Sequence, residues 1–192
     1  MFNMHFNKEP GPGTAVCTNI QAGIIFKEPG EEIRHVTGGD NLFITPRDLL
    51  IPAGASSHSA SREYVFEEAV ELLSFMPHMH LRGTAMSLEA ILPSGRRQLL
   101  SHVGDFNFNW HNSYVYTDDV APLLPKGTLM KVTAWYDNTA ANRSNPDPNV
   151  WVGSGSRTAD EMGHAWVNVT YFDDEDYEAE VAKREAAEDS GQ

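Results

Sequence analysis

The chain has 192 residues, of which 41% are hydrophobic and 21% are charged, a composition typical of a globular domain. Its 14 basic and 27 acidic residues give a net charge of −13, which argues against nucleic acid or an anionic membrane as the partner, because both attract a surplus of Lys and Arg. Cys17 is the single cysteine, so an internal disulfide framework and a cysteine-rich zinc site are excluded. No apolar run approaches the roughly 20 residues of a membrane span, and the N-terminal sequence has no signal-peptide pattern.

Frequent Gly and Pro turn signals divide residues 1–172 into short segments. Six of these segments have period-two alternation or a β-rich composition: Ala22–Phe26, Glu63–Phe66, Glu71–Leu81, Ser87–Leu92, Leu129–Trp135 and Ala165–Phe172. Short strands at this spacing predict an all-β fold, an antiparallel jelly-roll sandwich. Thr139–Gly155 is a long polar segment, predicted as a loop of a length that is often functional.

The end of the chain differs from the rest in charge. Residues 173–192 contain nine acidic and two basic residues and few large apolar ones. This composition predicts an acidic tail, helical or disordered, that lies outside the core.

Two histidines, His78 and His80, are the first candidate site. If the segment is a strand, they share one face with Met76 and Arg82, because residues two apart point the same way. The apolar residues of the segment then share the opposite face: Leu73, Phe75, Met79 and Leu81. Two imidazoles side by side are spaced to bind one metal ion, but a pair of surface histidines gives the same pattern. Pro77 favours an edge or a bulge at this point.

The segment Met162–Tyr171 has a similar two-faced pattern. Its even positions carry side chains of mixed character: Met162, His164, Trp166 and Asn168. Met162 is either a half-buried gap filler or a thioether ligand. As a ligand beside His78 and His80 it would complete a set of two nitrogens and one sulfur, which favours copper, because thioether sulfur suits Cu(I) and imidazole suits both oxidation states. Zinc sites normally use Cys, His or carboxylate ligands, and non-haem iron would require a carboxylate beside the histidines.

The sequence His78-Met79-His80-Leu81-Arg82-Gly83, followed by Asp160-Glu161-Met162, resembles the copper type II, ascorbate-dependent monooxygenases, the family of peptidylglycine α-hydroxylating and dopamine β-monooxygenases. Further motifs in the same order resemble its bacterial branch: Asp105–Trp110, Leu124–Thr128, Tyr136–Asn138 and Asn145–Pro148. The resemblance spans roughly Gly23 to Tyr171 and corresponds to the C-terminal, catalytic-copper domain of the family.

The resemblance implies a function. One copper ion, held by His78, His80 and Met162, would bind O₂, and a C–H bond of a small-molecule substrate would be hydroxylated with electrons from ascorbate. The family has a second copper in an N-terminal domain, and His5 in Met4-His5-Phe6 matches the third ligand of that site. The chain contains no adjacent His-His pair for the other two ligands, so we expect it to be incomplete as an isolated enzyme.

The resemblance also implies an organisation of the chain. Residues 1–20 would be the end of the N-terminal copper domain with a linker, residues 21–172 the jelly-roll domain, and residues 173–192 the acidic tail. Family members are normally exported, so we expect a secreted or periplasmic protein.

The substrate pocket departs from the family pattern. Where the peptide enzyme has Arg, Asn and Tyr, this chain has Met76, His164 and Trp166. We therefore expect an apolar or aromatic substrate, with His164 as a ligand, a substrate contact or a solvated residue. His111 is interpreted as a structural hydrogen-bonding residue. Two other classes remain: a non-enzymatic copper-binding or electron-relay module, and an interaction domain with a vestigial His-Met cluster.

Overall fold

A computed structural model describes residues 11–13, 15 and 17–190. The chain divides into two units, Met1–Arg34 and His35–Gln192. His5 lies outside the described residues. The predicted strand Ala22–Phe26 is wrong, because the segment forms no strand and Ile24, Ile25 and Phe26 are exposed. A β-rich composition does not make a strand unless a neighbouring strand satisfies its backbone N–H and C=O groups.

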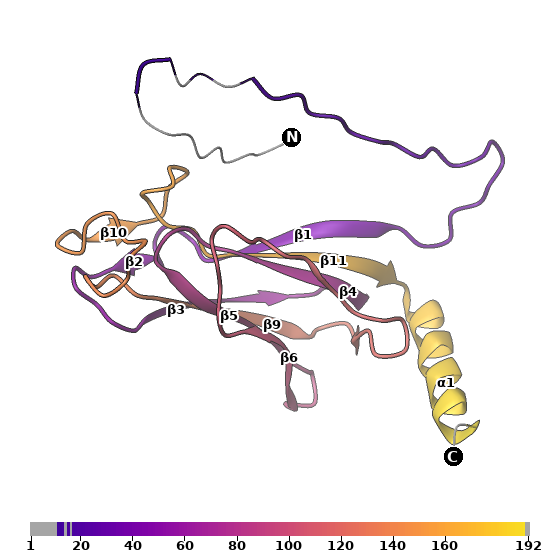
Figure 1. Cartoon of the computed structure of the whole chain (residues 1–192). Coiled ribbons are helices and arrows are strands. Elements are labelled where there is room, and N and C mark those ends of the chain that lie inside the picture. Colours follow the sequence, from indigo (N-terminus) through magenta and orange to yellow (C-terminus); the bar gives the residue numbers. More distant parts are fainter. Residues whose placement is uncertain (1–10, 14, 16, 191–192) are drawn as a thin grey trace. The chain divides into compact units, whose positions relative to one another are not determined.

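The second unit is an all-β antiparallel sandwich, as the turn spacing predicts (Figure 1). One sheet has the order β1 (Thr37–Phe43), β11 (His164–Phe172), β4 (Ala69–His78) and β7 (Tyr114–Val115), with β8 (Leu123–Leu124) also paired to β4. The other sheet has the order β3 (His58–Val65), β9 (Leu129–Tyr136), β5 (Gly83–Ile91) and β6 (Arg97–Val103). A small third sheet joins β10 (Val152–Gly153) to β2 (Leu50–Ile51).

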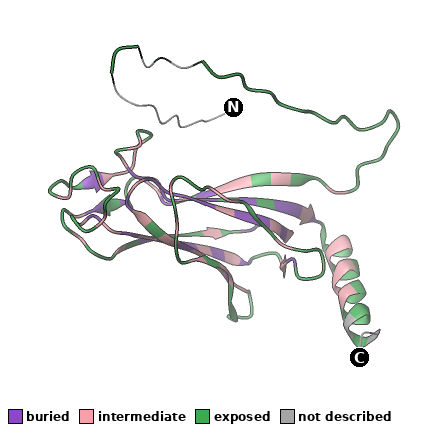
Figure 2. Cartoon of the chain, in the orientation of Figure 1, coloured by how far each residue is buried: buried purple, intermediate pink, exposed green. Residues whose placement is uncertain are grey.

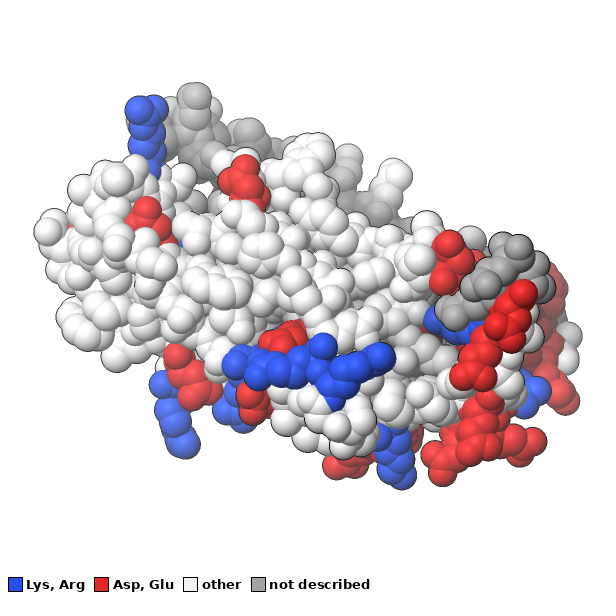
Figure 3. All heavy atoms as spheres, turned by 90° about the horizontal axis from the view of Figure 1, so that it is seen from below, with Lys and Arg blue, Asp and Glu red and all other residues white. Residues whose placement is uncertain are grey.

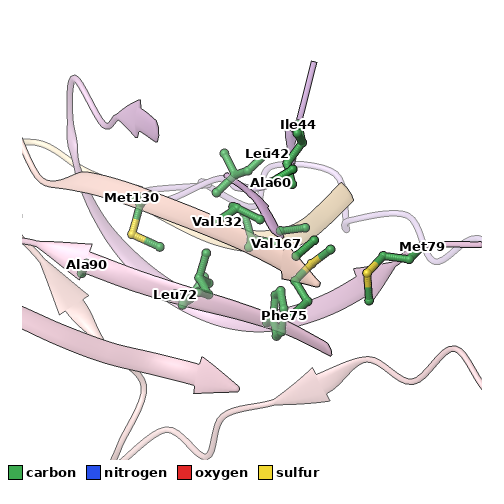
Figure 4. Close-up of a cluster of buried hydrophobic side chains, with 14 of the residues drawn as sticks. Leu42, Ile44, Ala60, Leu72, Phe75, Met79, Ala90, Met130, Val132 and Val167 are labelled. Carbon is green, nitrogen blue, oxygen red and sulfur yellow. The ribbon is translucent and has the colours of Figure 1, made fainter. Parts of the chain in front are cut away.

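The core lies between the two large sheets. Along β9 every second residue is buried, and the same alternation continues in β5 (Figure 2). Leu72, Phe75 and Val167 of the first sheet belong to one buried cluster with Val132 and Met130 of the second (Figure 4). Apolar surface buried in this layer stabilises the fold by about 25 cal/mol per Å², and this is the main stabilising contribution.

A β-bulge changes which residues of β4 reach the core. Ser74 pairs with Asn168 and Leu72 pairs with Val169, so Leu73 has no direct partner on β11. An extra residue in one strand reverses the alternation of side chains beyond it. Leu72 is therefore fully buried in the core, and the prediction that Leu73 faces the core is wrong.

The strand β4 also ends earlier than the sequence predicts. It stops at His78, and the chain continues through a turn to Gly83, where β5 begins. Met79 is fully buried in this turn, whereas Leu81 is half-buried. A Cβ at Gly83 would lie 2.5 Å from the Cβ of Met79, so only glycine allows the turn to close this tightly.

The acidic tail is a helix, α1 (Asp174–Ser190). Its first turn carries Asp174, Glu175 and Asp176, which favours a helix because the N-terminal end of the helix dipole is positive. Arg184 attaches α1 to the sandwich by donating to the carbonyl of Ala121 at 2.5 Å and by pairing with Glu71. Acidic side chains gather at the end of the molecule that carries α1 (Figure 3). In the described part of the chain, no helix has the length and apolar character needed to cross a membrane.

The bulge predicts unequal effects for two adjacent leucines. Leu72→Ala should lower the free energy of unfolding by about 2–5 kcal/mol, because it leaves a cavity in a fully buried layer. Leu73→Ala should cost about 1 kcal/mol or less, because this half-buried side chain lies outside the core cluster. Urea unfolding of both variants measures the difference. Equal losses would show that Leu73 contributes to the core and that the described register is wrong.

Candidate metal centre

The pairing of β4 with β11 brings two of the predicted residues together. His164, the first residue of β11, lies opposite His78, the last residue of β4. Their ring centroids are 6.0 Å apart and the rings are nearly perpendicular. Ala165 and Val167 point into the core, so the alternating residues His164 and Trp166 lie on the outer face of the sheet.

His80 reaches the same place although it lies beyond the end of the strand. Its ring centroid is 5.4 Å from that of His78, and the two rings are nearly perpendicular. His80 is fully buried, and its Nδ1 lies 3.0 Å from the carbonyl oxygen of Asp160. Since a carbonyl only accepts, this contact puts the proton of a neutral His80 ring on Nδ1.

Met162 lies two residues before β11, which begins at His164. Its carbonyl accepts a hydrogen bond of 3.0 Å from the hydroxyl of Tyr136. A Cβ at Gly163 would lie 2.6 Å from the same hydroxyl oxygen, so glycine is required for Tyr136 to approach. Met162 itself is half-buried.

The carboxylate of Glu161 ties the two segments together. Its Oε2 accepts from the backbone N–H of His80 at 2.8 Å and of Met162 at 3.3 Å. Its Oε1 accepts from the backbone N–H of Arg82 at 2.6 Å. Glu161 is fully buried, and its own backbone is held by Gly153 and Gly155. One side chain therefore sets the spacing between the chain around His80 and the chain around Met162.

Burial raises the pKa of Glu161 to about 7, and the hydrogen bonds from the backbone of Arg82 and His80 partly oppose that rise. Arg82 is also buried, with a pKa lowered by desolvation. Its Nε donates to Asn138 Oδ1 at 2.8 Å and its Nη1 donates to the carbonyl of Ala159 at 2.9 Å. The expectation that Arg82 shares a strand face with the histidines is wrong, because β4 ends at His78 and the buried guanidinium of Arg82 donates to Asn138 and to the carbonyl of Ala159.

The long loop is ordered by its own amides. Asn138 donates to the carbonyls of Pro52 and Val150 at 2.8 and 3.0 Å, and Asn145 donates to Asn138 Oδ1 at 3.0 Å. Through these contacts Asn138 holds the backbone at Pro52 and Val150 and anchors the long loop Thr139–Gly155.

His111 contacts His78, and the sequence could not identify this contact. Its Nδ1 lies 3.1 Å from Nδ1 of His78, and the ring centroids are 4.8 Å apart. The interpretation of His111 as a hydrogen-bonding residue is confirmed. Its partner could not be read from the sequence, because the two histidines are 33 positions apart, with two strands and a loop between them.

His164 is held beside His78 by Asn41, whose side-chain Nδ2 lies 2.9 Å from His164 Nδ1. Desolvation by burial lowers the pKa of His164, and the charge of His80 lowers it further. A lowered pKa favours the neutral imidazole, in which one ring nitrogen is a donor and the other an acceptor.

An aromatic row follows the outer face of the sheet next to His78. The ring of His164 stacks between Phe43 at 5.8 Å and Trp166 at 5.9 Å. Met76 lies directly opposite Trp166 across the strand pair. Trp166 is 41% exposed and Phe43 39% exposed. The predicted pocket residues Met76, His164 and Trp166 are therefore neighbours beside the histidine pair.

No group of three His, Cys, Asp or Glu side chains in residues 11–13, 15 and 17–190 is placed to hold a metal ion. For a metal centre at His78 and His80, Met162 is the further ligand that the sequence predicts. A cavity of about 550 Å³ lies elsewhere, lined by residues that include Asp40 of β1, Tyr64 of β3 and Tyr171 of β11.

No protein-family model matches the chain, and no curated protein matches it. Among solved structures, one of the infectious bursal disease virus Gt strain is similar over 78% of this chain and 38% of that chain, with 12% sequence identity and a TM-score of 0.22. The chain therefore spans less than two fifths of the length of that viral protein chain.

The raised pKa of Glu161 predicts a pH-dependent stability in the metal-free protein. An unfolded Glu has a pKa near 4.5, whereas the folded carboxyl has a pKa of about 7. The folded chain therefore holds a proton that the unfolded chain has released, and stability present below pH 4.5 is lost as the pH rises through 7, by up to about 3 kcal/mol. Glu161→Gln should remove this part of the pH dependence.

The measurement is urea unfolding of the wild type and Glu161→Gln at pH 5 and pH 8. The exposed Glu67→Gln is the matched control and should follow the wild type. At each pH, Glu161→Gln should also lower the free energy of unfolding by about 1–3 kcal/mol, because one buried backbone donor faces an amide nitrogen instead of an oxygen. An identical pH profile in wild type and Glu161→Gln would contradict the protonation of this carboxyl.

Proposed function

We propose that this chain is the catalytic-copper domain of a copper type II, ascorbate-dependent monooxygenase that hydroxylates a C–H bond of a small-molecule substrate. The observation that carries the proposal is the paired arrangement of His78 and His80, with Met162 tied to the same place by Glu161. The motif order in the sequence is the second support.

The histidine pair fits one metal ion. His80 directs its Nδ1 to the carbonyl of Asp160, and His78 directs its Nδ1 to His111. In both rings Nε2 is therefore the nitrogen that the proposal assigns to the metal. A metal about 2.0 Å from a ring nitrogen lies about 3.1 Å from the ring centroid, so two rings bound at tetrahedral to trigonal angles have centroids about 5.1 to 5.5 Å apart. The observed separation for His78 and His80 is 5.4 Å.

The third donor selects the metal. Thioether sulfur is a soft ligand that suits Cu(I), and imidazole suits both oxidation states of copper. No Asp or Glu side chain joins the two histidines in a three-residue group within the described chain, whereas a non-haem iron site would use one. Bound copper would supply O₂ binding and one-electron chemistry.

The residues of this chain have separate tasks in the proposal. Glu161 fixes the distance between the segments that carry His80 and Met162. His164, held by Asn41, stands next to His78 without belonging to the ligand set. Phe43, Trp166 and Met76 offer a substrate a partly exposed apolar wall beside the centre. An aromatic or apolar substrate fits this wall better than a charged one.

The proposal has consequences for partners. Electrons from ascorbate would reach the site through a second copper domain, of which His5 is the residue that this sequence contributes. A secreted or periplasmic location accompanies this assignment. O₂ and the small-molecule substrate are the remaining partners.

The ligand set is tested by substitution. His80→Ala and Met162→Ala should each weaken Cu(I) binding by at least about 100-fold, since loss of a ligand exceeds the 10–100-fold effect typical of an outer-shell partner. Competition with a Cu(I) chelator measures the affinity, and circular dichroism checks the fold. The exposed His102→Ala is the control and should bind as the wild type does. Equal Cu(I) affinity in His80→Ala, Met162→Ala and the wild type would overturn the assignment.

A further inference from the structure

We infer that His111 is a positioning residue for the metal centre, and that it acts as the hydrogen-bond acceptor that fixes the ring of His78. The inference rests on the proposed function, since it concerns the same copper site. It starts from the 3.1 Å contact between the two Nδ1 atoms and the nearly perpendicular rings, which meet at 85°.

The positions of the ring protons decide which of the two histidines donates the hydrogen bond. Two ring nitrogens at hydrogen-bond distance need one donor and one acceptor. If His111 donated, the neutral His78 ring would carry its own proton on Nε2 and would have no lone pair there for a metal. If His78 donates, its Nε2 is deprotonated and ready to bind. Only the arrangement with His111 as acceptor makes His78 a ligand.

The acceptor arrangement also defines the state of His111. Its Nδ1 accepts from His78, so its proton lies on Nε2, an atom shielded from solvent. His111 therefore matches the general pattern in which the second nitrogen of a ligand histidine is held by a fixed partner. An imidazole in that place differs from the carbonyl of Asp160, which performs the same task for His80.

The loop around His111 holds it in place. Phe106 and Phe108 contact its ring with centroids 5.5 and 5.4 Å away. Phe108 also contacts His80 at 5.8 Å. The loop is fastened at its start by the backbone bond from Phe106 to Thr84, at 2.9 Å. Phe108 thus packs against both His111 and His80, one of the two histidines of the site.

The experiment compares two substitutions of similar size and opposite chemistry. His111→Gln keeps an acceptor oxygen, and His111→Leu keeps apolar bulk but removes it. We expect Cu(I) affinity about 10–100-fold weaker in His111→Leu and within a few-fold of wild type in His111→Gln. The Cu(II) electron paramagnetic resonance spectrum should change in His111→Leu and be restored in His111→Gln. The exposed His102→Leu should change neither.

Two outcomes separate this inference from the proposed function. A wild type that binds no copper overturns the function and the inference together. A wild type that binds copper, with His111→Leu equal to it in affinity and spectrum, overturns the inference alone. Equal losses in His111→Leu and His111→Gln would also overturn it, because they indicate that packing or ligation by His111 is what matters.

A second test uses the wild type alone, so it does not depend on the folding of a variant. Imidazole ¹⁵N resonances of the metal-free protein at alkaline pH report which nitrogen of each ring is protonated. The inference predicts a proton on Nδ1 of His78 and on Nε2 of His111. The reverse assignment, with a proton on Nε2 of His78 and Nδ1 of His111, would contradict it.

Discussion

One buried carboxylate determines the shape of the candidate centre. Glu161 accepts three backbone hydrogen bonds, from His80, Arg82 and Met162, which belong to two segments about 80 residues apart in the sequence. Unmade hydrogen bonds to buried backbone donors cost about 1–3 kcal/mol each, so the three are satisfied together or the turn does not form. The positions of His80 and Met162 follow from this side chain more than from the strands beside them.

The sheet supplies the rest of the geometry. The register of β4 and β11 puts His78 beside His164 and Met76 beside Trp166 on the outer face, because alternate residues of paired strands point the same way. The turn from Met79 to Gly83 then brings His80 back to His78. Strand pairing and one buried acid thus act on the same few side chains. The candidate centre is therefore held from two directions.

Alternation predicted the sandwich, the strands that carry Phe75 and Val167, and the common face of His164 and Trp166. It failed at Leu73, because one inserted residue reverses the pattern and leaves no mark in composition. Alternation also predicted that His78 and His80 lie side by side on one strand. The strand ends at His78, so the pair depends on a turn that the pattern does not encode. The contact of His111 depends on how a loop folds back on the sheet, and short-range periodicity carries no information about that.

The proposed centre requires sulfur and nitrogen to converge on one soft ion. X-ray absorption at the copper edge of the Cu(I)-loaded chain counts those donors directly. We predict two imidazole nitrogens and one sulfur in the wild type, with the sulfur contribution lost in Met162→Leu. A copper shell without sulfur in the wild type, or one that Met162→Leu leaves unchanged, would contradict it.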